Sequence, residues 1–394
     1  MLILGTRPEA IKLFPVLQAL QRRQDKFRAL LCVTGQHREM VDQMLDLFEV
    51  KPDYDLSLMT ENQTLTEISA RALTAVRSVL FSAKPDLVLI QGDTTTVMTA
   101  ALAAYYEQIP VGHVEAGLRT GLKYAPFPEE INRRVVSVVA DFHFTPTPLA
   151  RKNLLAEGVR SDSIFVTGNT VVDALLEIGR RVKTPGMERT ILSGLKAQLT
   201  PSCVAALTGD PGAGRIILVT CHRRESFGKP LVNVCTALRS LAERNPEVEI
   251  VYPVHRNPNV LNVVEAMFGG RKPKLSNVHL LRPVDYLTFV FLMLRSYFLL
   301  TDSGGIQEEA PTYGKPVLVL RDATERQEAI ATGTARLVGT SPQRILRESE
   351  RLLRDLAAYR SMIKKKNPFG DGHASERIAD ILCRKFRKSR KEDA

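Results

Sequence analysis

The sequence predicts an α/β protein built from two doubly wound parallel sheets that face each other across a cleft. Short apolar runs of β type alternate with helical patterns, which is the order of elements in a parallel sheet covered by helices. This pattern occurs twice in 394 residues, a length that suffices for two domains with sizeable cores. Polar and charged residues follow the strands of both halves. Because ligands of open α/β sheets bind beyond the carboxyl ends of the strands, two sheets facing a cleft are the economical arrangement.

The strands are expected where apolar runs lead into small or polar residues. Those of the first half are LIL (2–4), ALLCVT (29–34), DLVLIQGD (86–93), IPVGHVEAG (109–117) and SIFVTGN (163–169). Those of the second half are RIILVTCH (215–222), VEIVYPVH (248–255), NVHLLRP (277–283), YFLLTDSGG (297–305) and KPVLVLRD (315–322). Shortly before the second sheet, TPSCVAALTGDPGAG (200–214) is rich in small residues, proline and glycine, and we expect a flexible insertion there.

Composition and charge narrow the classes of function. Apolar and charged residues make up 44% and 25% of the chain, and the sequence shows neither a membrane-spanning run nor the layout of a signal peptide. The five cysteines are scattered without close pairs, so we expect reduced thiols, no metal-binding knuckle and a cytoplasmic location. Part of the net charge of +11 lies in the C-terminal CRKFRKSRKEDA, without a nucleic-acid-binding motif beside it. We therefore expect a small polyanionic substrate rather than a nucleic acid.

The stretch GTRPEAIK leads from the first strand into a helix. Thr6, Pro8 and Glu9 fit an N-cap, a first turn and a capping box, so a structural role is favoured for them. Capping does not require Arg7 or Lys12. Because a cation at a helix start opposes the helix dipole, we expect Arg7 to bind phosphate oxygens of a ligand.

Carboxylates gather after the middle strands of the first half. They are Asp93, Glu115, Glu129 and Glu130. Carboxylates brought to one strand edge repel each other unless their protonation states differ, and this difference is how general acid and base pairs arise. The pattern therefore favours acid–base catalysis.

Two structural alternatives for these residues stay open. In the first alternative, Asp93 or Thr94 only caps the helix that follows. In the second, arginines of the same region form structural ion pairs with the carboxylates; these arginines are Arg119, Arg133 and Arg134.

Histidines and arginines follow strands of the second half. His222 lies beside Arg223 and Arg224, which favour an anionic ligand and lower the pKa of a neighbouring histidine. His255 also follows a strand and lies beside an arginine, in a proline-containing loop. The pattern favours a functional role less strongly for His255 than for His222. Arg326 is expected to face the cleft from the same side as the glycine motif TDSGGIQEEAP.

That motif runs from a strand into the start of a helix. Ser303, Gly304 and Gly305 offer free N–H groups, which suit an anion. Successive helical residues point about 100° apart, so Glu308 and Glu309 do not both face one ligand.

Ten sequence blocks together identify a family resemblance. They are GTRPEAIK, TGQHREM, GDTTT, GHVEAGLRTG, PFPEEINR, VTGNTVVDAL, HRRESFG, YPVHRNPNV, TDSGGIQEEAP and GKPVLVLRDATER. In this order they resemble the bacterial non-hydrolysing UDP-N-acetylglucosamine 2-epimerases. The resemblance runs from Gly5 to NPFGDGHASERI (367–378).

The resemblance implies the glycosyltransferase-B architecture. Two Rossmann-like domains are expected at 1–178 and 179–371, with a C-terminal helix at 372–394 that packs back on the first. The implied reaction is reversible epimerisation of UDP-GlcNAc to UDP-ManNAc, through elimination of UDP to a 2-acetamidoglucal and re-addition, without a cofactor or a metal. The product would supply ManNAc-type sugars for cell-surface polysaccharide. A homodimer is implied as well, with no membrane partner.

The resemblance also assigns residues. The catalytic positions match Asp93, Glu115, Glu129 and His222. The substrate-binding positions match Arg7, Lys12, Arg133, Ser303, Gly304, Gly305, Glu309 and Arg326. In some members UDP-GlcNAc also binds an allosteric site, whose positions match Gln36, His37, Arg223 and His255. Within the substrate site, Glu309 is expected to reach the ribose hydroxyls, while Ser303 to Gly305 hold the diphosphate.

The chain departs from the family pattern at a few positions. Gln91 stands where a histidine usually precedes Gly-Asp, and Cys221 where Gly or Ala precedes the histidine. Glu39 and Asn62 stand where allosteric members carry Gln and Arg. The insertion near 200–214 is not typical of the family, and the first strand is expected to be short because only four residues precede Gly5.

Three alternative functions stay open. The first is a hydrolysing epimerase that releases UDP and ManNAc. The second is a UDP-sugar glycosyltransferase on the same fold. The third is a nucleotide-sugar sensor without catalysis.

Overall fold

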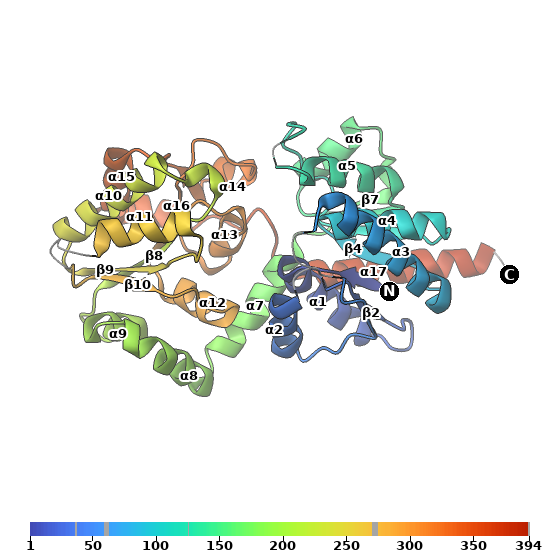
Figure 1. The fold of residues 1–394 in the computed structure, drawn as a ribbon, viewed down its shortest axis with the longest axis horizontal. Coiled ribbons are helices and arrows are strands. Elements are labelled where there is room, and N and C mark those ends of the chain that lie inside the picture. The colour runs from blue at the N-terminus through green and yellow to red at the C-terminus, as the bar shows by residue number, and fades with distance from the viewer. Residues whose placement is uncertain (36–37, 59–62, 125, 270–274, 393–394) are drawn as a thin grey trace. The chain divides into compact units, whose positions relative to one another are not determined.

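The protein divides into two compact units, Met1–Ala174 with Phe369–Ala394 (unit 1) and Leu175–Pro368 (unit 2). The computed structural model describes residues 1–35, 38–58, 63–124, 126–269 and 275–392. The unit boundaries lie a few residues before the domain boundaries expected from the sequence. Each unit is described by itself (Figure 1).

Unit 1 contains a seven-stranded parallel sheet in the order β3-β2-β1-β4-β5-β6-β7. Its strands are β1 (Leu2–Leu4), β2 (Leu31–Val33), β3 (Tyr54–Asp55), β4 (Val88–Gln91), β5 (Val111–Val114), β6 (Phe142–Thr145) and β7 (Ile164–Val166). Its helices are α1 (Arg7–Gln21), α2 (Arg38–Phe48), α3 (Leu65–Ala83), α4 (Thr95–Tyr106), α5 (Glu129–Val139), α6 (Pro148–Ala156) and α17 (Ala374–Glu392). Helices α3, α4 and α5 pack side by side on one face, and α1 packs with α2 and α17 (Figure 1).

Unit 2 contains a six-stranded parallel sheet in the order β10-β9-β8-β11-β12-β13. Its strands are β8 (Arg215–Thr220), β9 (Val248–Pro253), β10 (Val278–Leu281), β11 (Phe298–Thr301), β12 (Val317–Val319) and β13 (Ala335–Leu337). Its helices are α8 (Pro185–Leu195), α9 (Pro201–Thr208), α10 (Lys229–Arg244), α11 (Pro258–Phe268), α12 (Tyr286–Arg295), α13 (Gly304–Glu309), α14 (Gln327–Thr332), α15 (Pro342–Arg354) and α16 (Leu356–Ile363). Helix α7 (Thr170–Val182) contains the boundary between the units. Helices α10, α11 and α15 pack together, and α8, α9 and α12 form a second group (Figure 1).

The two doubly wound parallel sheets predicted from the sequence are confirmed. Each predicted apolar run contains a strand. The sequence pattern missed β3, β6 and β13, because β3 has only two residues and the other two carry a polar or charged residue at their centre.

The expectation of a flexible insertion at 200–214 is wrong for its first part, where α9 forms. The hydroxyl of Thr200 accepts a hydrogen bond from the N–H of Cys203 at 3.3 Å, and Pro201 occupies the first turn. Gly209 ends the helix with a φ of 80°, which glycine adopts without a steric cost. The small residues between these two ends therefore build a helix rather than a flexible loop.

Among the helices of the described residues, none combines the length and the apolar character that crossing a membrane would need.

Candidate active site

Glu115 follows β5 and is the most firmly held of the predicted catalytic carboxylates. Its backbone is left-handed, with a φ of 64°, a strained conformation for a residue that is not glycine. The buried carboxylate accepts hydrogen bonds from the ammonium group of Lys12 and from the side-chain amides of Gln91 and Asn169, the last at 2.8 Å. Three separate segments thus fix the position of this carboxylate.

Asp93 lies in the turn between β4 and α4. It does not cap α4: the hydroxyl of Thr94 does so, accepting from the N–H of Val97 at 3.3 Å. The carboxylate of Asp93 instead pairs with the guanidinium of Arg133, and its backbone oxygen accepts from the amide of Asn132 at 2.9 Å. Asp93 is therefore not needed for capping, and Arg133 holds it at the sheet edge.

Glu129 and Glu130 begin α5 and differ sharply in their surroundings. Glu130 is fully buried and accepts from the N–H groups of Thr120 and Gly121, at 3.1 and 3.2 Å, while Arg133 donates to it at 3.1 Å. Glu129 is partly exposed, and among the described residues its Oε2 makes no hydrogen bond. Glu130 thus has a structural role, whereas Glu129 retains an acceptor oxygen for a ligand.

The remaining arginines of this region divide between structural partners. Arg119 pairs with Glu157 at 2.7 Å, and Arg134 with Glu130 at 3.4 Å. The structural ion pairs considered from the sequence therefore exist, but among the described residues only Arg133 of the three joins a predicted catalytic carboxylate.

The start of α1 departs from the predicted capping box. The Thr6 hydroxyl donates to the carboxylate of Glu9 at 2.8 Å instead of accepting from the backbone N–H of Glu9. Glu9 also accepts from the N–H of Gly5 at 2.7 Å and from the hydroxyl of Thr94 at 2.8 Å. Burial raises the pKa of Glu9 to about 7 against these hydrogen bonds. Glu9 therefore ties the turn after β1 to the turn after β4, a tertiary role that the sequence pattern could not reveal.

Arg7 is the first residue of α1 and is half-buried. Among the described residues it forms no ion pair, so its charge at the helix start is available to a ligand.

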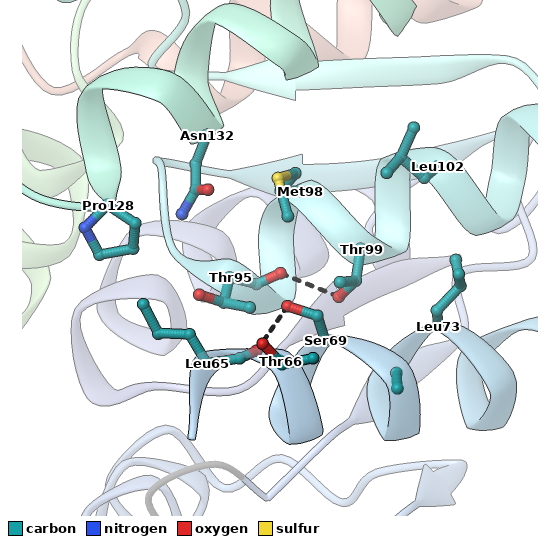
Figure 2. A pocket seen from close by; sticks show the side chains of 11 residues that line it. Leu65, Thr66, Ser69, Leu73, Thr95, Met98, Thr99, Leu102, Pro128 and Asn132 are labelled. Atoms are coloured by element: carbon teal, nitrogen blue, oxygen red, sulfur yellow. Dashed lines mark hydrogen bonds between the residues drawn. The ribbon is translucent and has the colours of Figure 1, made fainter. Parts of the chain in front are cut away.

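A groove of about 490 Å³ lies in unit 1 between α3, α4 and the start of α5. Figure 2 shows Pro128 and Asn132 at one end beside Thr95, and Leu73 and Leu102 towards the other. Asn132 belongs to both this groove and the turn of Asp93. None of the predicted catalytic residues lines the groove, which is therefore separate from the carboxylate site.

In unit 2, His222 follows β8 and lies over Asp302. The fully buried Asp302 accepts through Oδ2 from the N–H groups of His222 and Arg223, both at 2.8 Å, and from the hydroxyl of Ser226 at 2.9 Å. Its Oδ1 lies 3.5 Å from Nδ1 of His222. Partial burial lowers the pKa of His222, and the neighbouring His255 and Arg223 add to this shift while Asp302 opposes it.

The His255 ring stacks on that of His222, with centroids 5.6 Å apart. Of the four residues matched to an allosteric site, Arg223 and His255 lie in this cluster, whereas Gln36 and His37 lie outside the described residues. Asn62 also lies outside them. That site therefore stays a prediction.

Gly304 sits among charged side chains. A Cβ at this position would lie 2.9 Å from Oε1 of Glu325, and 3.3 Å from both the Arg223 and the Arg326 guanidinium groups. The two arginines pair with Glu325, each at 3.2 Å. Arg326 thus lies beside the glycine motif, and the absence of a side chain at Gly304 permits this approach.

Ser303 is the N-cap residue of α13, and Gly305 is its second residue. Glu309 at the other end reaches back, so that a Cβ on Gly305 would lie 3.7 Å from its Oε1. Glu308 is buried and accepts from Nε of Arg326 at 2.7 Å. Glu308 is thus bound to Arg326, whereas Oε1 of Glu309 lies beside Gly305.

Several residues of these clusters were not predicted as functional. Asn169 lies within the block VTGNTVVDAL, and Gln91 departs from the family pattern, but their contacts with Glu115 span 54 and 24 residues. Asp302 belongs to the glycine motif, yet its role as acceptor for the loop after β8 spans about 80 residues. A single sequence carries no signal for such long-range partners.

Comparisons with known proteins agree with one another. A family model described as UDP-N-acetylglucosamine 2-epimerase matches residues 18–383. A Ralstonia solanacearum protein named probable UDP-N-acetylglucosamine 2-epimerase is 52% identical over 97% of this chain and 98% of its own length. The Escherichia coli K12 UDP-N-acetylglucosamine 2-epimerase is 50% identical over 96% and 97% of the two chains. The Neisseria meningitidis UDP-GlcNAc 2-epimerase bound to UDP-GlcNAc is 44% identical with a TM-score of 0.87, covering 97% of this chain and 99% of that one. The predicted glycosyltransferase-B-like fold class is confirmed by this likeness.

Proposed function

Because the chain belongs to the UDP-N-acetylglucosamine 2-epimerase family, we propose that it interconverts UDP-GlcNAc and UDP-ManNAc without hydrolysing them. The hydrogen on C2 is not next to a carbonyl group, so simple enolisation is not available. Elimination breaks the C1–O bond to UDP, transfers the C2 proton to a base and leaves a 2-acetamidoglucal. Addition of UDP with proton return to the opposite face completes the epimerisation.

The observation that carries this proposal is the set of three carboxylates at one end of the unit 1 sheet, each in a different environment. We assign Glu115 to the positive charge that develops at C1, because three donors fix its carboxylate before the reaction starts. We assign the C2 proton to Asp93 and Glu129. Glu129 supports this role through its Oε2, which makes no hydrogen bond to the described residues. Two residues are needed because the proton leaves and returns on different faces.

Unit 2 is proposed to bind the UDP part. Ser303, Gly304 and Gly305 are assigned to the diphosphate, and Glu309 to the ribose hydroxyls. Arg326 beside Gly304 supports this assignment, since guanidinium groups bind phosphate oxygens in a fork. His222, whose pKa is lowered by burial, is assigned to the departing UDP oxygens as a hydrogen-bond donor.

The remaining substrate residues are assigned to unit 1. Arg7 is proposed to bind the diphosphate from the start of α1. Lys12 and Arg133 are proposed to hold the catalytic carboxylates in place through their ion pairs.

Incubation in D2O tests the reaction. UDP-GlcNAc is expected to give a mixture with UDP-ManNAc, with deuterium at C2 in both and no net release of UDP, measured by NMR. Net release of UDP with free ManNAc would instead identify a hydrolysing epimerase. No reaction until an acceptor sugar is added would identify a glycosyltransferase, and binding without any exchange would identify a sensor.

An Asp93→Asn variant separates catalysis from binding. The amide cannot accept the C2 proton as a carboxylate does, so turnover is expected to stop. UDP affinity, measured by calorimetry, is expected to stay within about twofold of the unchanged protein, since Asp93 is not among the residues assigned to UDP. An active variant would remove Asp93 from the proposed mechanism.

We further propose a cytoplasmic homodimer whose product enters the synthesis of cell-surface polysaccharide. Exposed aromatic and apolar side chains on the adjacent helices α3, α4 and α5 support a dimer face on unit 1; they are Phe81, Tyr105, Tyr106 and Val138. Light scattering after size-exclusion chromatography measures the mass, and a monomer at micromolar concentration would contradict the dimer.

A further inference from the structure

Three potential metal ligands of different kinds meet inside unit 2. They are Cys203 of α9, Glu249 of β9 and His279 of β10, and their donor atoms all lie within 4.8 Å of one another. None is more than 4% exposed. Nε2 of His279 lies 2.6 Å from Oε2 of Glu249. The cluster is separate from the loops of His222 and of the glycine motif, so the proposed epimerase site does not account for it.

The register of the sheet explains why the histidine and the glutamate meet. His279 pairs with Val251, which lies two residues after Glu249. Since side chains alternate along a strand, Glu249 and His279 point to the same face. The opposite face carries Ile250 and Tyr252 in the apolar core under α10 and α11.

Helix α9 brings the thiol to that face. It packs on β8 and β9 and also contacts α12. Its Thr200 cap fixes its start. Beyond its end the chain returns close to β9, where a Cβ on Gly214 would lie 2.1 Å from the carbonyl oxygen of Glu247. Both flanks hold Cys203 over the pair of Glu249 and His279, so the three donors are already gathered.

The donor types and their burial favour a cation here. A buried carboxylate is normally paired with a charge or bound to a metal. Among the described residues the ion-pair partner of Glu249 is His279, whose Nε2 is itself a metal donor atom, and the sulfur of Cys203 lies within 4.8 Å of both. Thiolate, imidazole and carboxylate together are a donor set that Zn²⁺ takes in proteins. We propose that Cys203, Glu249 and His279 bind one Zn²⁺, with water in the fourth position.

Binding of Zn²⁺ releases one proton from the cluster. The Cys203 thiol releases its proton to solvent, because the thiolate is the ligand form. In the metal-bound state the His279 ring keeps its proton on Nδ1, and Nε2 offers a lone pair to the metal. Zn²⁺ with one thiolate and one carboxylate gives a site of zero net charge. Tetrahedral ligands about 2.0–2.1 Å from the metal lie roughly 3.3 Å apart, so the 2.6 Å contact of Glu249 and His279 opens modestly.

The consequence of this site is local. The metal links α9, from the insertion that is not typical of the family, to two strands of the sheet. Ser202 hydrogen-bonds to Glu249 and orients its carboxylate, as outer partners of metal ligands commonly do. We expect the bound metal to stabilise unit 2 rather than to take part in the reaction.

The test uses the full chain, freed of metal with a chelator and titrated with Zn²⁺ or Co²⁺. We expect one Zn²⁺ per chain with a dissociation constant below about 1 µM, and a melting temperature raised by several degrees. Co²⁺ is expected to give a thiolate-to-metal absorption band in the near ultraviolet. Cys203→Ser and His279→Gln are expected to weaken binding at least tenfold and to abolish the melting shift.

Two buried cysteines of the same unit provide matched controls. Cys235→Ser alters the core on the opposite face, and Cys221→Ser tests a competing site beside His222. Both variants are expected to keep the metal and the Co²⁺ band. The proposal is overturned if the unchanged protein binds neither metal, or if binding persists in Cys203→Ser. If Cys203→Ser does not fold, the Co²⁺ band still tests the proposal. The proposal is overturned if this band is missing from the unchanged protein or is lost in Cys221→Ser.

Discussion

Lys12 and Glu115 form an ion pair that joins α1 to the residue after β5, although 103 residues separate them in the sequence. Both side chains are largely buried, and Gln91 and Asn169 donate to the same carboxylate. A carboxylate held in this way cannot turn away when a positive charge develops in front of it. The pair therefore links the packing of α1 to the chemistry proposed for Glu115.

Replacing Lys12 by methionine tests this link. Glu115 then loses its charged donor and is freer to shift, so we expect kcat/KM to fall by about 100-fold, consistent with the loss of one preorganised electrostatic contact. The free energy of unfolding is expected to fall by about 1–3 kcal/mol, because a buried carboxylate loses a charged donor. Lys26→Met is the control, since Lys26 pairs with Asp25 at 3.7 Å on the surface. Wild-type turnover in Lys12→Met would show that the ion pair has no catalytic role.

The neighbouring glutamates at the start of α5 are expected to respond in opposite ways to the same substitution. Glu129→Gln is expected to lower kcat by 10²–10⁴-fold with an unchanged melting temperature, as for the loss of a general acid or base. Glu130→Gln is expected to cost about 3 kcal/mol of stability, because it breaks a buried ion pair with Arg133. Activity assays and thermal unfolding of both variants decide. A stable, inactive Glu130→Gln together with an active Glu129→Gln would reverse the two roles.

The sequence predicted the strands well because their apolar residues are consecutive and lead into recognisable turns. The sequence was less informative where two neighbouring residues were both suited to the same structural role. Asp93 and Thr94 both cap helices, and the choice of Thr94 depends on the ion pair of Asp93 with Arg133, forty residues away. The capping box of Thr6 and Glu9 fitted the local pattern, yet Glu9 bonds instead to Thr94 of another turn.

Clusters assembled from distant segments were the least predictable. Cys203, Glu249 and His279 come from three different elements, so their spacing gives no hint of a site. The helix that carries Cys203 was itself expected to be flexible. Its small residues suit a loop and a helix almost equally, and the packing of α9 on the sheet determines which one forms.

Glu309, near the end of the glycine motif, is expected to control nucleotide affinity. Glu309→Gln removes the negative charge that is proposed to accept hydrogen bonds from the ribose hydroxyls. We therefore expect UDP to bind about 10- to 100-fold more weakly, as for the loss of a hydrogen bond to a charged group. Isothermal titration calorimetry with UDP measures the change. Glu350→Gln is the control, because Glu350 pairs with Arg354 on the surface of α15. Equal UDP affinities in the two variants would remove Glu309 from the site.

The pH dependence of stability is expected to reveal Glu9. Burial raises its folded pKa to about 7 from an ordinary value of 4.5, so the folded state holds a proton that the unfolded state releases. The contribution of Glu9 is therefore fully present below pH 4.5 and is lost as the pH rises towards 7. The loss amounts to about 3 kcal/mol for a shift of this size.

A comparison with Glu9→Gln isolates this contribution, because glutamine does not titrate. Unfolding in urea at several pH values between 4 and 8 is expected to show the variant gaining about 3 kcal/mol on the unchanged protein as the pH rises. Glu67→Gln provides a control of opposite sign. Hydrogen bonds from Thr64 lower the pKa of Glu67, so its contribution is lost as the pH falls, not as it rises. If the stability difference between Glu9→Gln and the unchanged protein does not vary with pH, the buried carboxyl of Glu9 is not protonated in the folded state.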